Sequence, residues 1–354
     1  MLRRYTERLT ATDYVMFVIG SLVVLGVIVG SIATLAAGKY SARQWSDLII
    51  FGVALGGIYA LIALGYTLVY GILRMINFAH SEVFMAGPFT AYFLADAWGK
   101  SGFLDDNPIL GIVLLFLVSM AVSVGVAILL ERIAYRPLRF APRLVPLITA
   151  IGASFFLQYF FRGLYGPNIK VYPTIAALQG DFSIGSDFKI TYLQTLVIVA
   201  AALMMAGLQI FINYTRTGKA MRAVAEDKQT AALMGINVDN IIVTTFVLGG
   251  ALAGAAGVLY ALMFKQVAFN MGFIPGIKAF TAAVLGGIGN VPGAMVGGLF
   301  LGVIESVGPS LFLDGLGIPA PYQLKDAIAF TLLVLVLIFR PTGILGEKLA
   351  EKKA

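Results

Sequence analysis

The 354-residue sequence contains no cysteine and a single histidine, His80. A disulfide framework, a thiolate zinc site and a cysteine nucleophile are therefore excluded, as is any site built from two histidines. Charged residues make up only 12% of the chain, about half the share of an ordinary soluble domain. The sequence thus predicts no metal site and lacks the charged surface of a typical soluble protein.

Apolar residues make up 59% of the chain, and it contains 40 glycines. A soluble core of this length could not bury so much apolar surface, whereas lipid can solvate it. Glycine is also more frequent in membrane helices than in soluble ones. The sequence therefore predicts an all-α polytopic membrane protein with one transmembrane domain over residues 1–354.

Ten apolar segments are expected to form membrane helices, since a span needs about 20 apolar residues, or fewer where neighbours shield it. The first segment is too long for the core of a signal peptide, so we expect an uncleaved helix. The eighth and ninth are short and glycine-rich, and they form either two crossings or one re-entrant pair. The segments lie near 14–37, 48–70, 82–98, 109–130, 147–165, 191–212, 241–262, 277–289, 293–308 and 324–339.

The positions of Lys and Arg predict the orientation. Most of the 25 basic residues fall on one side when the N-terminus is placed inside, and both termini are then cytoplasmic. Basic clusters at the two ends of the chain contribute to this count: Arg3, Arg4, Arg8, Lys348, Lys352 and Lys353. Because these loop clusters account for the net charge of +7, nucleic acid is not an expected partner.

Two loops on the predicted cytoplasmic side differ in character. The first, 131–146, carries four arginines and three prolines and has the composition of a basic connector. The second, 213–240, is longer and predicts a helix with apolar residues among charges: Met221, Val224, Ala225, Leu233 and Met234. Such a helix lies at a surface. It is a membrane-surface helix, a solvated connector or a docking element for a cytoplasmic partner.

Four polar residues lie at or near membrane depth. Asn77, His80 and Glu82 occur where the second segment gives way to the third, and Glu305 lies in the ninth. Ionisable groups inside membrane segments are costly and often functional. At a helix break, however, such groups can satisfy freed backbone atoms instead, and Glu305 could also sit near the water interface. These four residues are candidates for a substrate path, with the structural role left open.

Two glycine pairs indicate an internal repeat. Gly56-Gly57 and Gly249-Gly250 open similar helices that run in opposite directions in the predicted topology, and each ends near an asparagine, Asn77 or Asn270. Inverted repeats with broken helices are typical of transporters. We therefore predict an inverted repeat that relates helices 2–5 to helices 7–10.

The run LGGIGNVPG, residues 285–293, predicts a tight break between the eighth and ninth segments. Glycine allows unusual backbone angles, and proline blocks continuation of a helix by removing a donor. The residues expected to form the break are Gly286, Gly287, Gly289, Asn290, Pro292 and Gly293.

Enzyme signatures are missing. Gly99-Lys100-Ser101 resembles the end of a phosphate-binding loop, but Leu94 stands where the first glycine of that motif should be. There is no HExxH motif, no serine elbow and no paired-carboxylate site. The chain is therefore expected to have no catalytic residues and to bind no cofactor.

Three stretches, in order, resemble the branched-chain amino-acid permease family, specifically its LivH-type member. They are ALIALGYTLVYGILRMINFAHSEVFMAG (60–87), RAVAEDKQTAALMGIN (222–237) and AVLGGIGNVPGAMVGGLFLGVIE (283–305). The resemblance covers about residues 48 to 345. The first 40 or so residues, which include the extra N-terminal helix 14–37, are less distinctive.

The resemblance implies a permease subunit of an ATP-binding-cassette importer, located in a prokaryotic cytoplasmic (inner) membrane. It would move branched-chain or related amino acids inward along a path lined by the second and seventh helices. The implied partners are a second, LivM-like permease, two cytoplasmic ATP-binding subunits that use ATP, and a periplasmic or extracellular substrate-binding protein. Whether the two permease chains are different or identical stays open.

The resemblance also implies a coupling helix in the loop 213–240. The residues expected to couple to the ATPase are Arg222, Glu226, Asp227, Ala231, Ala232 and Gly235. The usual importer pattern, EAA followed three residues later by Gly, does not align here. Ala231-Ala232 is followed by Gly235 after only two residues, with Thr230 in place of Glu.

Alternatives remain within and outside this class. Related permeases for urea or short amides share these motifs. A secondary transporter or a passive channel would need no ATPase, and the coupling-type loop argues against both.

Overall fold

The computed structural model describes residues 11–139, 141–142, 144–184, 188–340 and 342–346. The basic residues at 3, 4, 8, 143, 348, 352 and 353, which contribute to the predicted orientation, lie outside the described residues. Within them the chain is mostly helical, and eight helices are long and apolar enough to cross a membrane. The prediction of an all-α polytopic membrane protein is confirmed.

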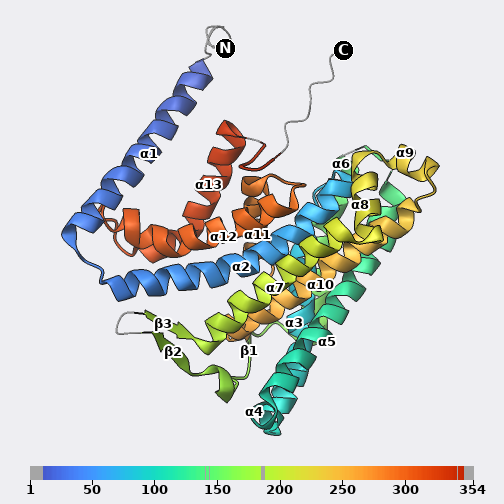
Figure 1. Ribbon diagram of the computed structural model, residues 1–354, viewed down its shortest axis with the longest axis horizontal. Helices are drawn as coiled ribbons and strands as arrows, with labels where there is room; N and C mark the ends of the chain where they lie inside the picture. Colours follow the sequence, from blue (N-terminus) through green and yellow to red (C-terminus); the bar gives the residue numbers. More distant parts are fainter. Residues whose placement is uncertain (1–10, 140, 143, 185–187, 341, 347–354) are drawn as a thin grey trace.

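All ten expected segments form helices, with bounds close to those predicted (Figure 1). Eight have the length and composition of membrane spans, α13 when the preceding turn at Pro321–Leu324 is included: α1 (Ala11–Ala37), α2 (Ala42–Leu73), α5 (Pro108–Leu129), α6 (Leu144–Tyr165), α7 (Tyr192–Tyr214), α10 (Val238–Phe264), α12 (Val291–Gly308) and α13 (Lys325–Phe339). The other two are α3 (His80–Lys100), which is more polar, and α11 (Phe273–Gly286), which has only 14 residues.

The ninth segment is longer than the sequence suggested. Helix α12 continues through the π-helical turn η5 (Pro309–Leu313), which gives a 23-residue span. Helix α5 is extended in the same way by the π-helical turn η2 (Leu130–Tyr135) and the 3₁₀ turn η3 (Arg136–Leu138). Helix α11 is short but α12 is not, so they do not form a pair of equally short helices. The number of crossings stays a prediction.

Short elements join the long helices. They include the turns η4 (Ala176–Leu178) and η6 (Pro321–Leu324) and four strands, and α4 (Phe103–Asp106) and β1 to β3 lie on one side of the molecule (Figure 1). β1 (Lys170–Val171) pairs antiparallel with β4 (Gln266–Val267), and β2 (Asp181–Ile184) pairs antiparallel with β3 (Phe188–Thr191). At the opposite side lie α8 (Arg216–Glu226) and α9 (Lys228–Leu233) (Figure 1).

Helices α2 and α10 form the centre of the helical body. In their most apolar windows 78% and 72% of the residues are buried, against 6% in α1 and in α13. Glycines allow the close approach that this packing requires. A β-carbon at Gly302 would overlap the backbone of α2 at Gly56, and one at Gly254 would overlap α5 at Ser119. Among the eight candidate spans, the two most buried are therefore the second and seventh expected segments.

The packing shows a recurring arrangement. α2 packs chiefly on α12, and α10 packs chiefly on α5. Counted as expected segments, α2 and α12 are the second and ninth, and α10 and α5 are the seventh and fourth. A repeat that relates helices 2–5 to helices 7–10 would make these two pairs equivalent. In addition, α2 and α10 both end at a basic residue in the left-handed region, Arg74 (φ 55°) and Lys265 (φ 54°). The inverted repeat stays a prediction, and this packing is the kind that it requires.

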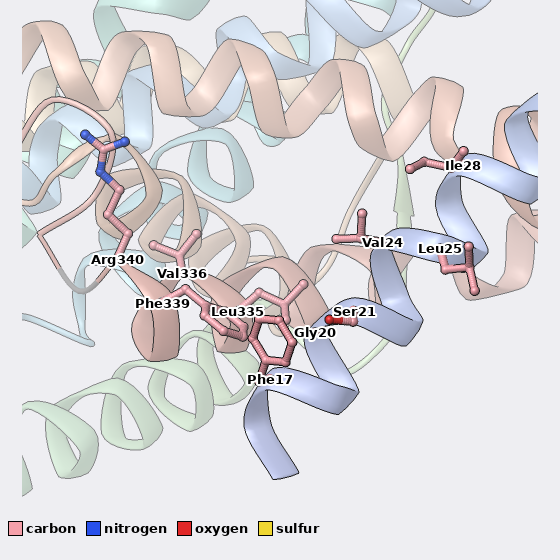
Figure 2. Close-up of a pocket in the computed structure, with 10 residues that line it drawn as sticks. All are labelled: Phe17, Gly20, Ser21, Val24, Leu25, Ile28, Leu335, Val336, Phe339 and Arg340. Atoms are coloured by element: carbon pink, nitrogen blue, oxygen red, sulfur yellow. The ribbon is translucent and has the colours of Figure 1, made fainter. Parts of the chain in front are cut away.

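Helix α1 stands away from the body and forms an apolar groove with α13 (Figure 2). The groove encloses about 610 Å³ and is lined from α1 by residues such as Phe17 and Val24, and from the other side by Leu335 and Phe339. None of its lining residues is a candidate for the substrate path. A face of this composition is suited to lipid acyl chains rather than to a polar solute.

Candidate functional site

Helix α3 begins inside the protein, and the start of α11 lies beside its first turn. The chain leaves α2 at Leu73 and enters α3 at His80, a buried residue. In α11, β-carbons at Gly272 and Gly276 would overlap Ser81 in the first turn of α3. Irregular backbone at membrane depth is tolerated when protein buries it, as it is here. The first candidate site is this junction.

Asn77 and His80 fix the start of α3 to its neighbours. The Tyr135 hydroxyl donates a hydrogen bond to Asn77 Oδ1 at 2.5 Å. The His80 ring lies edge-on to Tyr66 and fits against Gly65 of α2, where a β-carbon would clash with it. The Nε2 of this ring has no hydrogen-bond partner among the described residues.

Glu82 is fully buried in the first turn of α3. Its Oε1 accepts hydrogen bonds from Gln158 Nε2 at 3.0 Å, Ser154 Oγ at 3.2 Å and Ser81 Oγ at 3.3 Å. These donors are all neutral. Oε2 has no hydrogen-bond partner in the described part of the chain, and no ion pair to Glu82 occurs there. The carboxyl group therefore keeps one oxygen available for another donor.

Glu305 lies in a different environment. Lys278 of α11 donates to its Oε1 at 2.6 Å and also forms an ion pair with Asp326 at 2.6 Å. The Lys278 ammonium lies 5.8 Å from the centroid of the Tyr59 ring. Lys278 and Glu305 are buried, whereas Asp326 is partly exposed. The structure thus brings Asn77, His80 and Glu82 together and places Glu305 in a separate charge cluster.

Sequence reasoning missed several partners of these residues. Lys278 stands in an apolar run, and the rule that selected Glu305 would have selected it too. Gln158 and Ser154 are 76 and 72 positions from Glu82, and Tyr135 is 58 positions from Asn77. Nothing in the sequence indicates those three pairings.

The expected break lies between α11, which ends at Gly286, and α12, which begins at Val291. Gly287 (φ 106°) and Gly289 (φ 96°) adopt angles that favour glycine. Asn290 caps α12 by accepting from the Gly293 amide at 2.9 Å, and Pro292 occupies the first turn. The chain near the C-terminus closes over this break, because the Ile344 and Leu345 amides donate to carbonyls at the end of α11.

The loop 213–240 contains two helices, α8 and α9, rather than one. Met221, Val224 and Ala231 are buried against the helical body. Leu233 and Met234, expected on the same apolar face, are instead 88% and 78% exposed. The loop therefore has one face that packs on the protein and an apolar end that does not.

The remaining coupling candidates shape this loop. Arg222 donates to the Asn213 carbonyl at 3.4 Å, and Glu226 ends α8. Asp227 caps α9 by accepting from two backbone amides, while Ala232 is exposed. Gly235, with φ 82°, ends the segment in open space. The six residues thus build the loop rather than a binding pocket.

Positive charge gathers beside the loop. Burial, and then the neighbouring guanidinium groups of Arg139 and Arg74, lower the pKa of Lys228 below its usual value. Arg74 also donates to the Ala225 carbonyl at 3.2 Å, which ties the end of α2 to α8. Basic groups are therefore gathered at the start of α9, in the same loop as the exposed apolar end.

Comparison with known proteins identifies relatives over most of the chain. A family described as "Branched-chain amino acid transport system / permease component" matches residues 48–337. The high-affinity branched-chain amino-acid transport system permease protein BraD of Pseudomonas aeruginosa is 47% identical over 308 residues, which cover 86% of this chain and 96% of that protein. LivH of Escherichia coli is 43% identical over 305 residues, covering 85% and 95%.

A sugar permease is more distant. The galactose/methyl galactoside import permease protein MglC of Haemophilus influenzae is 30% identical over 170 residues, which is 46% of this chain and 48% of that protein. The LivH-type resemblance is confirmed by the broader and stronger matches. The chain belongs to the family of branched-chain amino-acid transport system permease components.

Proposed function

We propose that this protein is the membrane-spanning permease subunit of an ATP-driven importer that carries branched-chain or related amino acids into the cytoplasm. Separate cytoplasmic subunits bind and hydrolyse ATP, a second permease completes the path, and a soluble protein outside delivers the substrate. The membrane is the prokaryotic inner membrane, with both termini of this chain in the cytoplasm.

The observation that carries the proposal is how α8 and α9 are attached. Arg74 at the end of α2 donates to Ala225 in α8, and α10 begins at Val238, directly after the loop. The loop is therefore joined to both central helices, and its apolar end at Leu233 and Met234 is exposed. A partner that binds this end and moves it displaces α2 and α10 together, which is the requirement for coupling.

The candidate path runs by the junction of α3 and α11. An amino acid carries a carboxylate and an ammonium group, and its transfer needs partners for both. Asn77 and His80 would meet the carboxylate, and the free oxygen of Glu82 suits the ammonium group. Urea and short amides can also donate N–H hydrogen bonds to this oxygen but carry no charge, so only an amino acid would form an ion pair with Glu82.

The transport cycle follows from two arrangements of α2 and α10. ATP-bound partners favour the arrangement that opens outward, and hydrolysis returns the path to the inward one. ATP can drive this change only if it stabilises one arrangement over the other. Selectivity resides mainly in the soluble binding protein, because a path must hold its substrate weakly enough to release it.

The test is a purification under mild detergent followed by transport in proteoliposomes. We expect two ATP-binding subunits and a second permease to copurify, and leucine uptake to require ATP and the binding protein. The Leu233→Ser/Met234→Ser double variant should lose the ATP-binding subunits and the uptake. Val171→Ser is the matched control, since Val171 is 72% exposed in β1 at the other end of the molecule.

Other outcomes point to other functions. Leucine uptake that survives ATP depletion but needs an ion gradient would indicate a secondary transporter, and uptake that needs neither would indicate a channel. ATP-dependent uptake of urea, with none of leucine, would assign the protein to the amide-transporting relatives.

A further inference from the structure

The π-helical turn η2 carries two buried polar side chains that contact different parts of the protein. Tyr135 donates to Asn77 at the start of the candidate path, and Glu131 forms an ion pair with Arg139. Glu131 and Tyr135 have 0% and 1% of their surface exposed. π-Helical turns are rare and are frequent at functional sites. This one joins the path to a charge cluster near the coupling loop.

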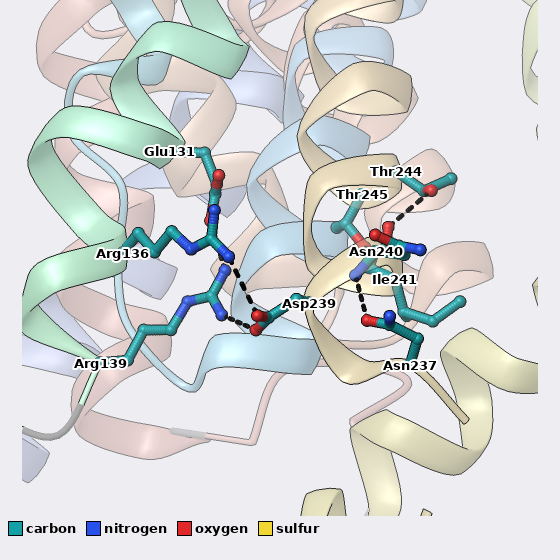
Figure 3. A network of polar contacts seen from close by, with 9 residues as sticks. All are labelled: Glu131, Arg136, Arg139, Asn237, Asp239, Asn240, Ile241, Thr244 and Thr245. Atoms are coloured by element: carbon teal, nitrogen blue, oxygen red, sulfur yellow. Dashed lines mark hydrogen bonds and ion pairs between the residues drawn. The ribbon is translucent and has the colours of Figure 1, made fainter. Parts of the chain in front are cut away.

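Arg139 bridges η2 and α10 (Figure 3). Its guanidinium group forms ion pairs with both Glu131 and Asp239, and Arg136 reaches Asp239 at 3.1 Å. Asp239 lies in the first turn of α10, two positions after Asn237, whose side chain caps that helix. An unbroken series of contacts therefore leads from the end of the coupling loop through Arg139 and η2 to Asn77.

The bridge has unused pairing capacity. Glu131 Oε2 and Arg139 Nε are buried without hydrogen-bond partners among the described residues. A guanidinium group that now holds one oxygen of each carboxylate could instead hold both oxygens of Glu131. Arg139 thus has a second arrangement within reach. A contact series transmits a change only if it contains an element with two arrangements.

We propose that Arg139 is a positioning residue that transmits the position of α10 to Asn77 through η2. When the coupling loop moves the first turn of α10, the ion pair between Asp239 and Arg139 either breaks or moves Arg139 with it. The π-helical turn then changes the position of Tyr135 relative to Asn77. The inference rests on the proposed function, because it assumes that the loop is moved by ATP-binding partners. The ordinary alternative is a static ion cluster that only holds α5 to α10.

The test uses the whole transporter complex in proteoliposomes and measures leucine molecules carried per ATP hydrolysed. Asp239→Asn breaks the bridge at α10, and Tyr135→Phe removes the hydrogen bond to Asn77. Each should lower the ratio by about 2- to 30-fold. The double variant should be no worse than the poorer single one, because both interrupt the same series of contacts. Asp239→Glu should restore most of the ratio.

The control is Asp181→Asn, which breaks the exposed ion pair between Asp181 and Lys189 in the β2–β3 hairpin, 3.2 Å long. It should leave the ratio unchanged. A static cluster would lower the melting temperature of the Asp239→Asn complex and leave the ratio of the intact complexes at the wild-type value. That result, or independent losses that multiply in the double variant, would overturn the inference.

Failure of the proposed function would give a different result from failure of the inference alone. In that case the wild-type complex itself would couple no leucine uptake to ATP, and the inference would fall with it. If the wild type transports leucine and Asp239→Asn, Tyr135→Phe and their double variant all behave like Asp181→Asn, only the inference is wrong.

Discussion

Glu82 and Glu305 are buried carboxyl groups in helices of one membrane protein, and the fold surrounds them in opposite ways. Glu305 faces a lysine ammonium at 2.6 Å, with a second carboxylate on the other side of that lysine. Glu82 faces two hydroxyls and an amide, all of them neutral, while the second oxygen of each carboxyl group has no hydrogen-bond partner among the described residues. One group has its charge compensated within the fold, and the other does not.

This difference predicts a structural role for Glu305 and leaves Glu82 as the candidate for transport. A buried ion pair holds its partners firmly, because removal of either one leaves an uncompensated charge in a medium of low polarity. Lys278 joins α11 to α12 and α13, so this cluster anchors three helices. A carboxyl group held by neutral donors can exchange partners at lower cost. Glu82 is therefore the better candidate for contact with a passing substrate, although both glutamates satisfied the same sequence criterion.

The largest expected effect is that of Lys278→Met, which tests whether the Glu305 cluster is structural. Removal of the lysine leaves Glu305 buried beside Asp326 without a cation, at a cost of about 3–5 kcal/mol in unfolding free energy. The measurement is an unfolding titration with SDS in mixed micelles. The Lys278→Met/Glu305→Met double variant should recover a large part of the loss, since apolar pairs can replace a buried ion pair. A double variant as unstable as the single one would contradict a charge-compensation role.

The next effect compares one chemical change at two positions. Glu305→Gln removes the charge that Lys278 faces and should cost about 1.5–3 kcal/mol of stability. Glu82→Gln should cost less than about 1 kcal/mol, because the amide oxygen still accepts from Ser154 and Gln158. For leucine uptake by folded complexes we expect the opposite order, with the larger loss in Glu82→Gln. Glu82→Gln should lower leucine uptake by roughly tenfold, the equivalent of about 1.4 kcal/mol of lost interaction with a charged group.

Leucine uptake by equal amounts of assembled complex decides between the two roles. If Glu82→Gln transports normally while folded Glu305→Gln complexes do not, the assignment of roles is reversed. If both lose stability equally, the neutral surroundings of Glu82 have no functional meaning.

The sequence predicted the helices well and their contacts poorly. Segment 241–262 became α10 (Val238–Phe264), and segment 324–339 became α13 (Lys325–Phe339), because long apolar runs define membrane helices by composition alone. The four strands were missed. β1 and β4 have two residues each, too few for any alternation to be recognised. The π-helical extensions η2 and η5 were missed as well, since local hydropathy does not distinguish them from α-helix.

The sequence selected the residues of the candidate site but did not indicate the surroundings of each. The rule that a polar group at membrane depth is functional selected Glu82 and Glu305 alike. The partners that distinguish them come from α6 and α11, which packing brings beside α3 and α12. Lys278 shows the limit of the method, because it was visible in the sequence but its pairing with Glu305, 27 positions away, depends on how α11 packs on α12.

The smallest expected effect isolates one neutral donor. Ser154→Ala removes the hydroxyl that donates to Glu82 at 3.2 Å, with an expected loss of about 0.5–1.5 kcal/mol. Ser46→Ala is the matched control, because the exposed Ser46 hydroxyl donates only to its own helix at Ala42. Alanine favours helix slightly at both positions, so Ser46→Ala should be neutral or stabilising in the same SDS titration. In a Glu82→Leu background the acceptor is absent, and the cost of Ser154→Ala should disappear. A cost that persists there would mean that Ser154 stabilises α6 by packing, and that the neutral donors around Glu82 do not act on its carboxyl group.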